Sequence, residues 1–162
     1  MSFDETLLAE MVEAAAQAGL QIILIGNVAA IVHGAPVLTR DVDFMVREHP
    51  KLQEKLLKFA EIYGVKLTRP YAPLAKVIRA IGRSVPIDFV FSLSSGKSFE
   101  SVRSRAHRIR LGRKMVWVAS LEDIIAAKRA ADRPKDKAAL LVLEETWKIQ
   151  KAMAKEKRKN TH

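Results

Sequence analysis

The sequence contains no cysteine. Disulfide bonds, thiolate metal sites and cysteine nucleophiles are therefore excluded, and any bound metal must rest on oxygen or imidazole ligands. Long apolar runs are also missing: no segment approaches the roughly 18 residues that span a bilayer, and the acidic N-terminus is unlike a signal peptide. We expect a cytoplasmic protein with no membrane partner.

Acidic residues are in the minority in the C-terminal part of the chain. Residues 1–64 carry nine acids and five bases, whereas residues 65–162 carry nine acids and twenty-three bases, within a net charge of +10. An uneven positive charge of this size is typical of proteins that bind a polyanion such as RNA. Small basic proteins without such a partner also show it, so the charge alone leaves both interpretations open.

The order of apolar segments predicts a fold of the α/β (α+β) class. Up to Gly64 a strand-like apolar run is twice followed by a helical pattern, and after it the pattern changes to several short strands. A length of 162 residues with 49% hydrophobic content suits one domain over 1–162, built on a mixed twisted β-sheet flanked by helices. The expected strands cover 20–25, 43–46, 65–68, 76–81, 85–91, 108–111 and 114–118.

Helix signals mark both ends of the chain. Ser2 and Glu5 form a capping box ahead of apolar residues at helical spacing, which predicts a first helix. Near the other end, C-terminal helices over 120–157 are expected to pack on the domain, the last of them starting at Pro134. We expect the lysine-rich tail after Met153 to be frayed.

Asp41 and Asp43 lie one residue apart, at the start of an apolar run. If both belong to a strand, their carboxylates share one face while Val42 and Phe44 turn toward the interior. Two adjacent negative charges are unfavourable without a cation, and Mg²⁺ prefers one or two carboxylates together with substrate phosphates. The alternative is a loop aspartate that caps a local turn beside a solvated neighbour.

Two further features suit the same chemistry. Gly26-Asn27 lies where the first apolar strand gives way to a helix, so the backbone can approach a ligand and free amides face an anion. Asp88 interrupts the apolar stretch from Val85 to Phe91, where an unpaired carboxylate is costly to bury. Three acids on neighbouring strands would form a magnesium site for phosphoryl or nucleotidyl transfer. The alternative for Asp88 is an edge strand facing water.

These motifs, in this order, resemble the nucleotidyltransferase superfamily related to DNA polymerase beta: Gly26-Asn27, Thr39-Arg40-Asp41-Val42-Asp43 and Asp88. With His33-Gly34 between the first two, the pattern is closest to the small bacterial branch found in toxin–antitoxin and abortive-infection systems. The resemblance implies the polymerase beta-like nucleotidyltransferase fold with C-terminal helices. It also implies Mg²⁺ as cofactor and a nucleoside triphosphate (NTP) as substrate.

The resemblance further assigns roles to single residues. The catalytic and metal-binding acids would be Asp41, Asp43 and Asp88, the last also activating the acceptor. The triphosphate would be bound by the start of the first short helix and the segment before the acids: Gly26, Asn27, Thr39 and Arg40. Asn27 departs from the family, which has Gly or Ser at this position.

The C-terminal part carries a second stretch that resembles the family: Ser120 to Lys128, followed by Arg133-Pro134-Lys135-Asp136. It implies that Lys128 is a catalytic, triphosphate-binding cation and that Asp136 lies in the nucleotide site, since a lysine neutralises developing phosphate charge. The residues alone fit another interpretation. Lys128 would then be a solvated helix residue, and Asp136 would favour the positive end of its helix.

A basic segment lies between the two motif regions. From 101 to 121 there is no acid and there are six bases, namely Arg103, Arg105, Arg108, Arg110, Arg113 and Lys114. On a strand, alternate arginines project from one face, where an RNA backbone would lie. The alternative is a solvated edge strand whose charges discourage aggregation.

Two classes of function follow. The first is a Mg²⁺-dependent nucleotidyltransferase that moves a nucleoside monophosphate from an NTP to a macromolecule, with tRNA favoured by the charge, or to a toxin or antitoxin partner protein. The second is a catalytically silent module of the same fold that binds RNA or a partner. A small-molecule acceptor is a third expectation, disfavoured because the chain looks too short for an additional helical domain.

Overall fold

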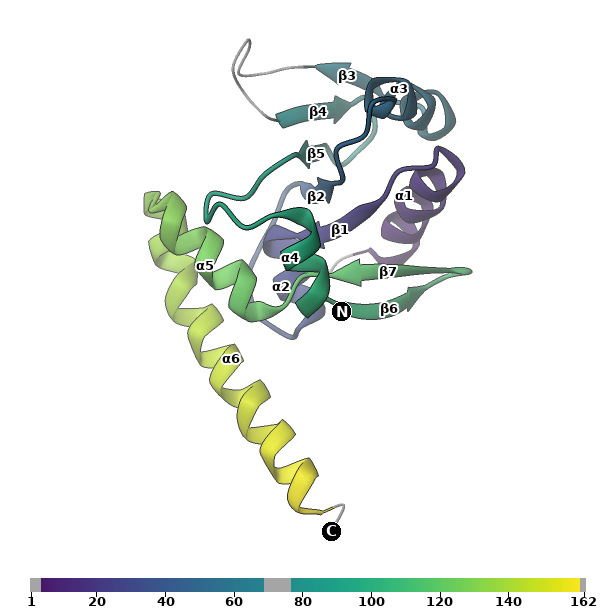
Figure 1. The fold of residues 1–162 in the computed structure, drawn as a ribbon. Helices are drawn as coiled ribbons and strands as arrows, with labels where there is room; N and C mark the ends of the chain where they lie inside the picture. The colour runs from purple at the N-terminus through teal and green to yellow at the C-terminus, as the bar shows by residue number, and fades with distance from the viewer. Residues whose placement is uncertain (1–3, 69–76, 161–162) are drawn as a thin grey trace.

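The computed structural model describes residues 4–68 and 77–160. Its centre is a seven-stranded mixed sheet with the order β3-β4-β5-β2-β1-β7-β6 (Figure 1), which confirms the predicted fold class. The strands are β1 (Ile22–Ile25), β2 (Val42–Val46), β3 (Lys66–Thr68), β4 (Val77–Ile81), β5 (Ile87–Val90), β6 (His107–Leu111) and β7 (Lys114–Val118). The helices are α1 (Glu5–Gln17), α2 (Gly26–Val32), α3 (Leu52–Tyr63), α4 (Phe99–Arg105), α5 (Leu121–Ala131) and α6 (Pro134–Lys159).

The register of the central strands lines up charged residues across the sheet. β2 runs parallel to β5 and pairs Asp43 with Asp88. β4 runs antiparallel to β5 and pairs Arg79 with Asp88. Because directly paired residues in neighbouring strands point to the same face, Arg79, Asp88 and Asp43 form a row on one face of the sheet.

The opposite face of the same strands is apolar. Phe44 and Phe89, which follow the two acids in sequence, are fully buried and stack with ring centroids 6.1 Å apart. Phe59 of α3 meets Phe89 edge to face at 5.1 Å. Burying these three rings holds β2 and β5 against α3, so the alternation of strand side chains leaves the acids on the other face.

The remaining helices pack around this sheet in two groups. α1 contacts α3, β6 and β7, while α2 contacts β1, β2 and α5, and α6 packs along α5. In Figure 1, α3 lies to the right of β3 and β4, α1 to the right of β1 and β2, and α5 and α6 to the left of the sheet. Helix α5 therefore covers the end of the sheet where α2 begins.

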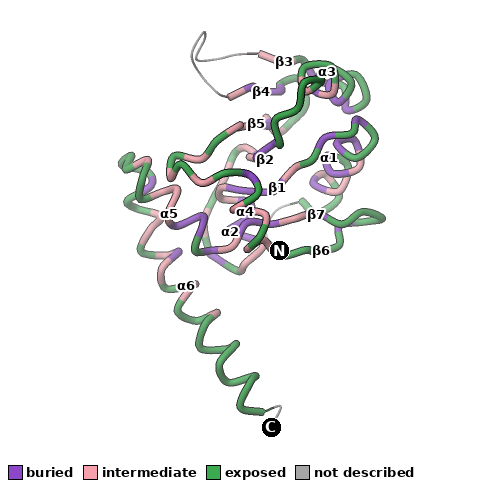
Figure 2. The backbone as a smooth tube through the Cα atoms, viewed as in Figure 1, coloured by how far each residue is buried: buried purple, intermediate pink, exposed green. Residues whose placement is uncertain are grey.

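The chain ends differ from the sequence prediction. Asp4 caps α1, its carboxylate accepting from the amides of Thr6 and Leu7, so the predicted start at Ser2 is wrong, and Ser2 lies outside the described residues. The tail after Met153 is not frayed, because α6 continues to Lys159 and stands clear of the body with its last turns exposed (Figure 2). No helix in the described ranges, α6 included, is long and apolar enough to cross a membrane.

Candidate functional site

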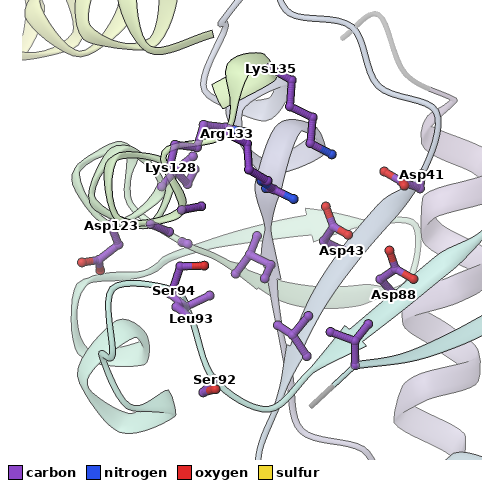
Figure 3. A pocket seen from close by; sticks show the side chains of 18 of the residues that line it. Asp41, Asp43, Asp88, Ser92, Leu93, Ser94, Asp123, Lys128, Arg133 and Lys135 are labelled. Atoms are coloured by element: carbon purple, nitrogen blue, oxygen red, sulfur yellow. The ribbon is translucent and has the colours of Figure 1, made fainter. Parts of the chain in front are cut away.

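A pocket of about 520 Å³ opens on the acidic face of the sheet. Figure 3 shows Asp41, Asp43 and Asp88 on one side, and the side chains of α5, Asp123 among them, and of the start of α6 on the other. The residues that carry charge into it are Asp41, Asp43, Arg79, Asp88, Asp123, Lys128, Arg133 and Lys135. The pocket thus brings together an acidic wall and a basic wall.

The three predicted acids share this pocket. Asp43 lies in β2 between the buried Val42 and Phe44, as the alternation predicted, and Asp88 is its partner in β5. Asp41 lies just before β2, so of the pair only Asp43 is a strand residue, which agrees with the expected strand over 43–46. β5 has neighbours on both sides, so the edge-strand alternative for Asp88 is excluded.

The environment of Asp43 is unfavourable for a negative charge. Burial, followed by the charges of Asp41 and Asp88, raises the pKa of Asp43 from 3.8 to about 7, against the opposing effect of Lys128 and Lys135. Within the described residues the side chain of Asp43 makes no hydrogen bond or ion pair. A bound cation would relieve this cost, since an opposite charge favours the ionised form.

Arg79 is a member of the site that the sequence reasoning missed. Its Nε and Nη2 atoms donate to the two oxygens of Asp88 at 2.8 and 2.9 Å, and Nη2 also donates to Asp41 Oδ2 at 3.3 Å. Paired arginine and carboxylate groups of this fork-like geometry are among the stronger hydrogen bonds. A sequence signal for this contact exists: only Gly82-Arg83-Ser84 separates the expected strands 76–81 and 85–91, which predicts a hairpin and places β4 beside β5.

The start of α2 approaches the acids closely. Gly26 has a φ of +68°, and a Cβ at this position would collide with the carboxylate of Asp43. Only glycine therefore combines this backbone conformation with the present position of Asp43. The pocket owes its depth beside β2 to the missing side chain.

Asn27, Thr39 and Arg40 are placed differently from one another. The side-chain amide of Asn27 donates to the carbonyl of Leu38 at 3.0 Å, while its Oδ1 is buried without a partner among the described residues. Thr39 Oγ1 donates to the carbonyl of Asp41 at 2.8 Å and so supports the turn into β2. Both residues line a smaller hollow of about 100 Å³ that shares Asp41 and Asp43 with the main pocket. Arg40 is exposed and lines neither space, so its role stays a prediction.

Lys128 and Asp136 meet at the junction of α5 and α6. The Lys128 side chain is only 13% exposed, which excludes the solvated alternative, and its Nζ lies 3.7 Å from Asp136 Oδ1. Burial lowers the pKa of Lys128 despite the nearby charges of Asp136 and Asp43. Asp136 is buried at the first turn of α6, where it also pairs with Arg133 Nε at 2.7 Å. Asp136 thus holds two cations in place at the pocket wall.

Arg133 and Lys135 are two further cations that the sequence reasoning quoted only as part of a motif. Both line the pocket and its smaller neighbour. In Figure 3 their side chains extend toward the acids. Burial raises the pKa of Asp136, but its hydrogen bonds with Arg133 outweigh this and lower it, so the pair stays charged at neutral pH. With Lys128 they give the pocket a three-cation wall.

Asp123 lines the pocket, but its carboxylate is occupied by two ion pairs outside it. Its side chain is 0% exposed and pairs with Lys97 Nζ at 2.7 Å and Arg105 Nε at 2.9 Å. These contacts fasten the Ser92–Ser98 segment and α4 onto α5. We assign Asp123 a structural role in shaping the pocket.

The basic segment lies away from the pocket. Arg108 and Arg110 are exposed on β6, the edge strand at the opposite end of the sheet from β3. The guanidinium of Arg103 covers the half-buried ring of Trp117, 4.0 Å from its centroid. An exposed basic edge fits both the RNA interpretation and the protective one.

Comparison with known proteins assigns the fold and the family. The family described as "Nucleotidyl transferase of unknown function (DUF2204)" matches residues 5–161. No curated protein matches the chain. Among solved structures it is similar to the antibiotic-resistance factor ANT(2'')-Ia in solution, with 16% identity, 98% of this chain and 97% of that chain covered, and a TM-score of 0.60.

Two further structures show the same fold. The crystal structure of ANT(2'')-Ia in complex with adenylyl-2''-tobramycin is 16% identical, with 94% of this chain and 97% of that chain covered and a TM-score of 0.61. A putative nucleotidyltransferase (TM1012) from Thermotoga maritima is 14% identical, with 96% and 92% covered and a TM-score of 0.52. At these identities the likeness concerns the fold.

Proposed function

Because the chain belongs to this family of nucleotidyl transferases, we propose that it transfers a nucleoside monophosphate from a Mg²⁺-bound NTP to an acceptor in the pocket between β2, β5 and α5. The family assignment confirms the predicted enzyme class and disfavours a silent module. The observation that carries the proposal is the convergence of Asp41, Asp43 and Asp88 on one pocket whose other wall is basic.

The acidic wall fits a divalent metal. Carboxylate oxygens are the ligands that Mg²⁺ prefers, and it commonly takes one or two carboxylates with substrate phosphates rather than a complete protein cage. Among residues 4–68 and 77–160 no ready-made cluster of three metal-binding side chains exists. In the proposed reaction Asp41 and Asp43 would hold the Mg²⁺, with Asp88 as third ligand or general base. When bound, Mg²⁺ would neutralise charge that develops on the phosphates.

The chain's own residues supply the rest of the reaction. Lys128, Arg133 and Lys135 would bind the triphosphate, Gly26 would let it approach the start of α2, and Asn27, Thr39, Arg40 and Asp136 complete the predicted nucleotide site. The acceptor hydroxyl attacks the α-phosphorus, forming a new O–P bond as the bond to the β-phosphate breaks and pyrophosphate leaves. The hydroxyl proton passes to a carboxylate, for which Asp88 is the candidate.

We favour tRNA as acceptor because the surface is strongly basic. The exposed arginines of β6 and the bases of α6 offer contacts to a phosphate backbone outside the pocket. Within the same chemistry the acceptor would be a hydroxyl of a partner protein if the chain belongs to a toxin–antitoxin pair. A partner gene beside its own would support that role.

A small molecule is a second candidate acceptor. The match covers 97% of ANT(2'')-Ia, whose crystal structure is a complex with adenylyl-2''-tobramycin. The length of this chain is therefore no reason against a small-molecule acceptor. The pocket of about 520 Å³ lies within the range of about 300–1,000 Å³ that is typical of small-molecule sites. An aminoglycoside-like acceptor is therefore included in the transfer assay described next.

One assay with several acceptors tests the proposal. The protein is incubated with Mg²⁺ and each α-³²P-labelled NTP, together with total tRNA, an aminoglycoside panel or a co-encoded partner protein. We expect label in one acceptor class, loss of transfer in Asp43→Asn, and normal transfer in Glu61→Gln, which changes an exposed acid of α3. Absence of transfer to every acceptor, with no NTP-dependent rise in Tm, would contradict the proposed function.

A further inference from the structure

Arg79 occupies the position on the acidic wall where a metal ion would compete for the same oxygens. The strand register places it directly beside Asp88, with Asp43 next in the row. Both oxygens of Asp88 accept from Arg79, at 2.8 and 2.9 Å. The same Nη2 atom that bonds Asp88 also bonds Asp41 at 3.3 Å. One guanidinium therefore bridges two of the three acids.

This bridge fixes the carboxylates at a spacing set by arginine. The Arg79 side chain is 30% exposed, and those of Asp88 and Asp41 are 15% and 35% exposed, so the contact is partly shielded from water. Charge-assisted, two-pronged pairs of this kind hold their partners in a defined orientation. The carboxylates of Asp41 and Asp88 are both turned toward Arg79.

We propose that Arg79 is a positioning residue that holds Asp41 and Asp88 in the nucleotide-free enzyme and must give up at least part of this contact when metal enters. The inference rests on the proposed function, because it needs a metal at the acidic wall. A divalent ion carries twice the charge of the guanidinium and can compete for the same carboxylate oxygens. A triphosphate that arrives with the ion offers Arg79 phosphate oxygens as replacement partners. Free metal without nucleotide has to break the same bridge with less assistance. Arg79 therefore lowers the affinity for metal alone.

The test measures metal binding without nucleotide, so it does not depend on turnover. Mn²⁺ replaces Mg²⁺ because its paramagnetism allows the free ion to be counted by electron paramagnetic resonance. We compare the wild type with Arg79→Gln, which removes the charge, and with Arg79→Lys, which keeps the charge and loses the fork. The matched control is Arg83→Gln, because Arg83 forms an ion pair with Glu10 at 2.8 Å and does not line the pocket.

We expect Arg79→Gln to bind Mn²⁺ about tenfold more tightly than the wild type, a change of the size of one charge-assisted bond. The Mn²⁺ affinity of Arg79→Lys should lie between these two, and that of Arg83→Gln should equal the wild-type affinity. Asp43→Asn shows whether the counted ion lies at the acidic wall. If Asp43→Asn abolishes binding but Arg79→Gln binds no more tightly than the wild type, the role of Arg79 is overturned while the metal site stands. If no variant binds Mn²⁺ in a manner that depends on Asp43, both ideas fail. Should Arg79→Gln not fold, Arg79→Lys decides on the same criterion.

Discussion

Replacing Asp43 by Asn should stabilise the protein, and more so at high pH. The pKa of Asp43 rises from 3.8 to about 7 on folding, chiefly because of burial and then because of Asp41 and Asp88. Between these two values the folded state holds a proton that the unfolded state has lost, so the free energy of unfolding falls as the pH rises. At about 1.4 kcal/mol per pH unit, the full cost above pH 7 is up to about 4 kcal/mol.

The measurable quantity is the difference between two pH values. From pH 5 to pH 8 the stabilisation of Asp43→Asn over the wild type should grow by about 2 to 3 kcal/mol, or roughly 5–10 °C in Tm for a chain of this size. Urea unfolding with a metal chelator present measures it, and comparing pH values cancels any constant effect of the amide. Glu61→Gln, an exposed acid, is the control. Parallel stability profiles for Asp43→Asn and the wild type would refute the reasoning.

Three further changes test other parts of the site. Gly26→Ala forces a Cβ against Asp43 at a φ of +68°, so we expect a loss of about 1–3 kcal/mol in urea unfolding and a lower transfer rate. Lys128→Met removes a cation from the proposed nucleotide wall and should weaken NTP binding by about tenfold to a hundredfold in calorimetry. Mn²⁺ binding should not weaken, because the charge of Lys128 acts on Asp43 and opposes a second cation there. Asp123→Asn breaks two ion pairs around a fully buried side chain and should cost about 2–4 kcal/mol. Burial raises the pKa of Asp123, but hydrogen bonds from Arg105 and Lys97 lower it overall, so this stabilisation is present above the unfolded pKa and is lost on acidification. The loss should show as a smaller acid sensitivity of the Asp123→Asn variant in urea titrations.

The sequence was most informative where a local pattern determines which face of a strand a side chain occupies. Val42 and Phe44 are apolar and alternate with Asp43, and one buried face is enough to force the acid to the other. Helix caps are a local signal of the same kind: the side chains of Ser98 and Ser120 cap the first turns of α4 and α5. These features depend on neighbours in the chain, which a single sequence displays.

The contacts of Arg79 could not be predicted from local patterns. The hairpin that joins β4 to β5 was predicted, but a slip of one residue in its register would put Arg79 and Asp88 on opposite faces. Turn length fixes that register, and the residues from Gly82 to Ser84 are compatible with more than one turn. Asn27 differs in another way, because its amide bonds the carbonyl of Leu38, eleven residues later along the chain. No local sequence pattern predicts this contact.

If the proposed reaction takes place in this pocket, the division of charge there sets the direction in which the nucleotide lies. An NTP carries its negative charge on the triphosphate, so the cations Lys128, Arg133 and Lys135 favour that end on the α5–α6 side. The acids would repel the same phosphates unless a metal lies between them. In the proposed reaction, binding of nucleotide and metal is therefore cooperative: each removes the repulsion that the other meets. The raised pKa of Asp43 and the bridge from Arg79 both reflect the excess of negative charge on the acidic wall when no ligand is bound.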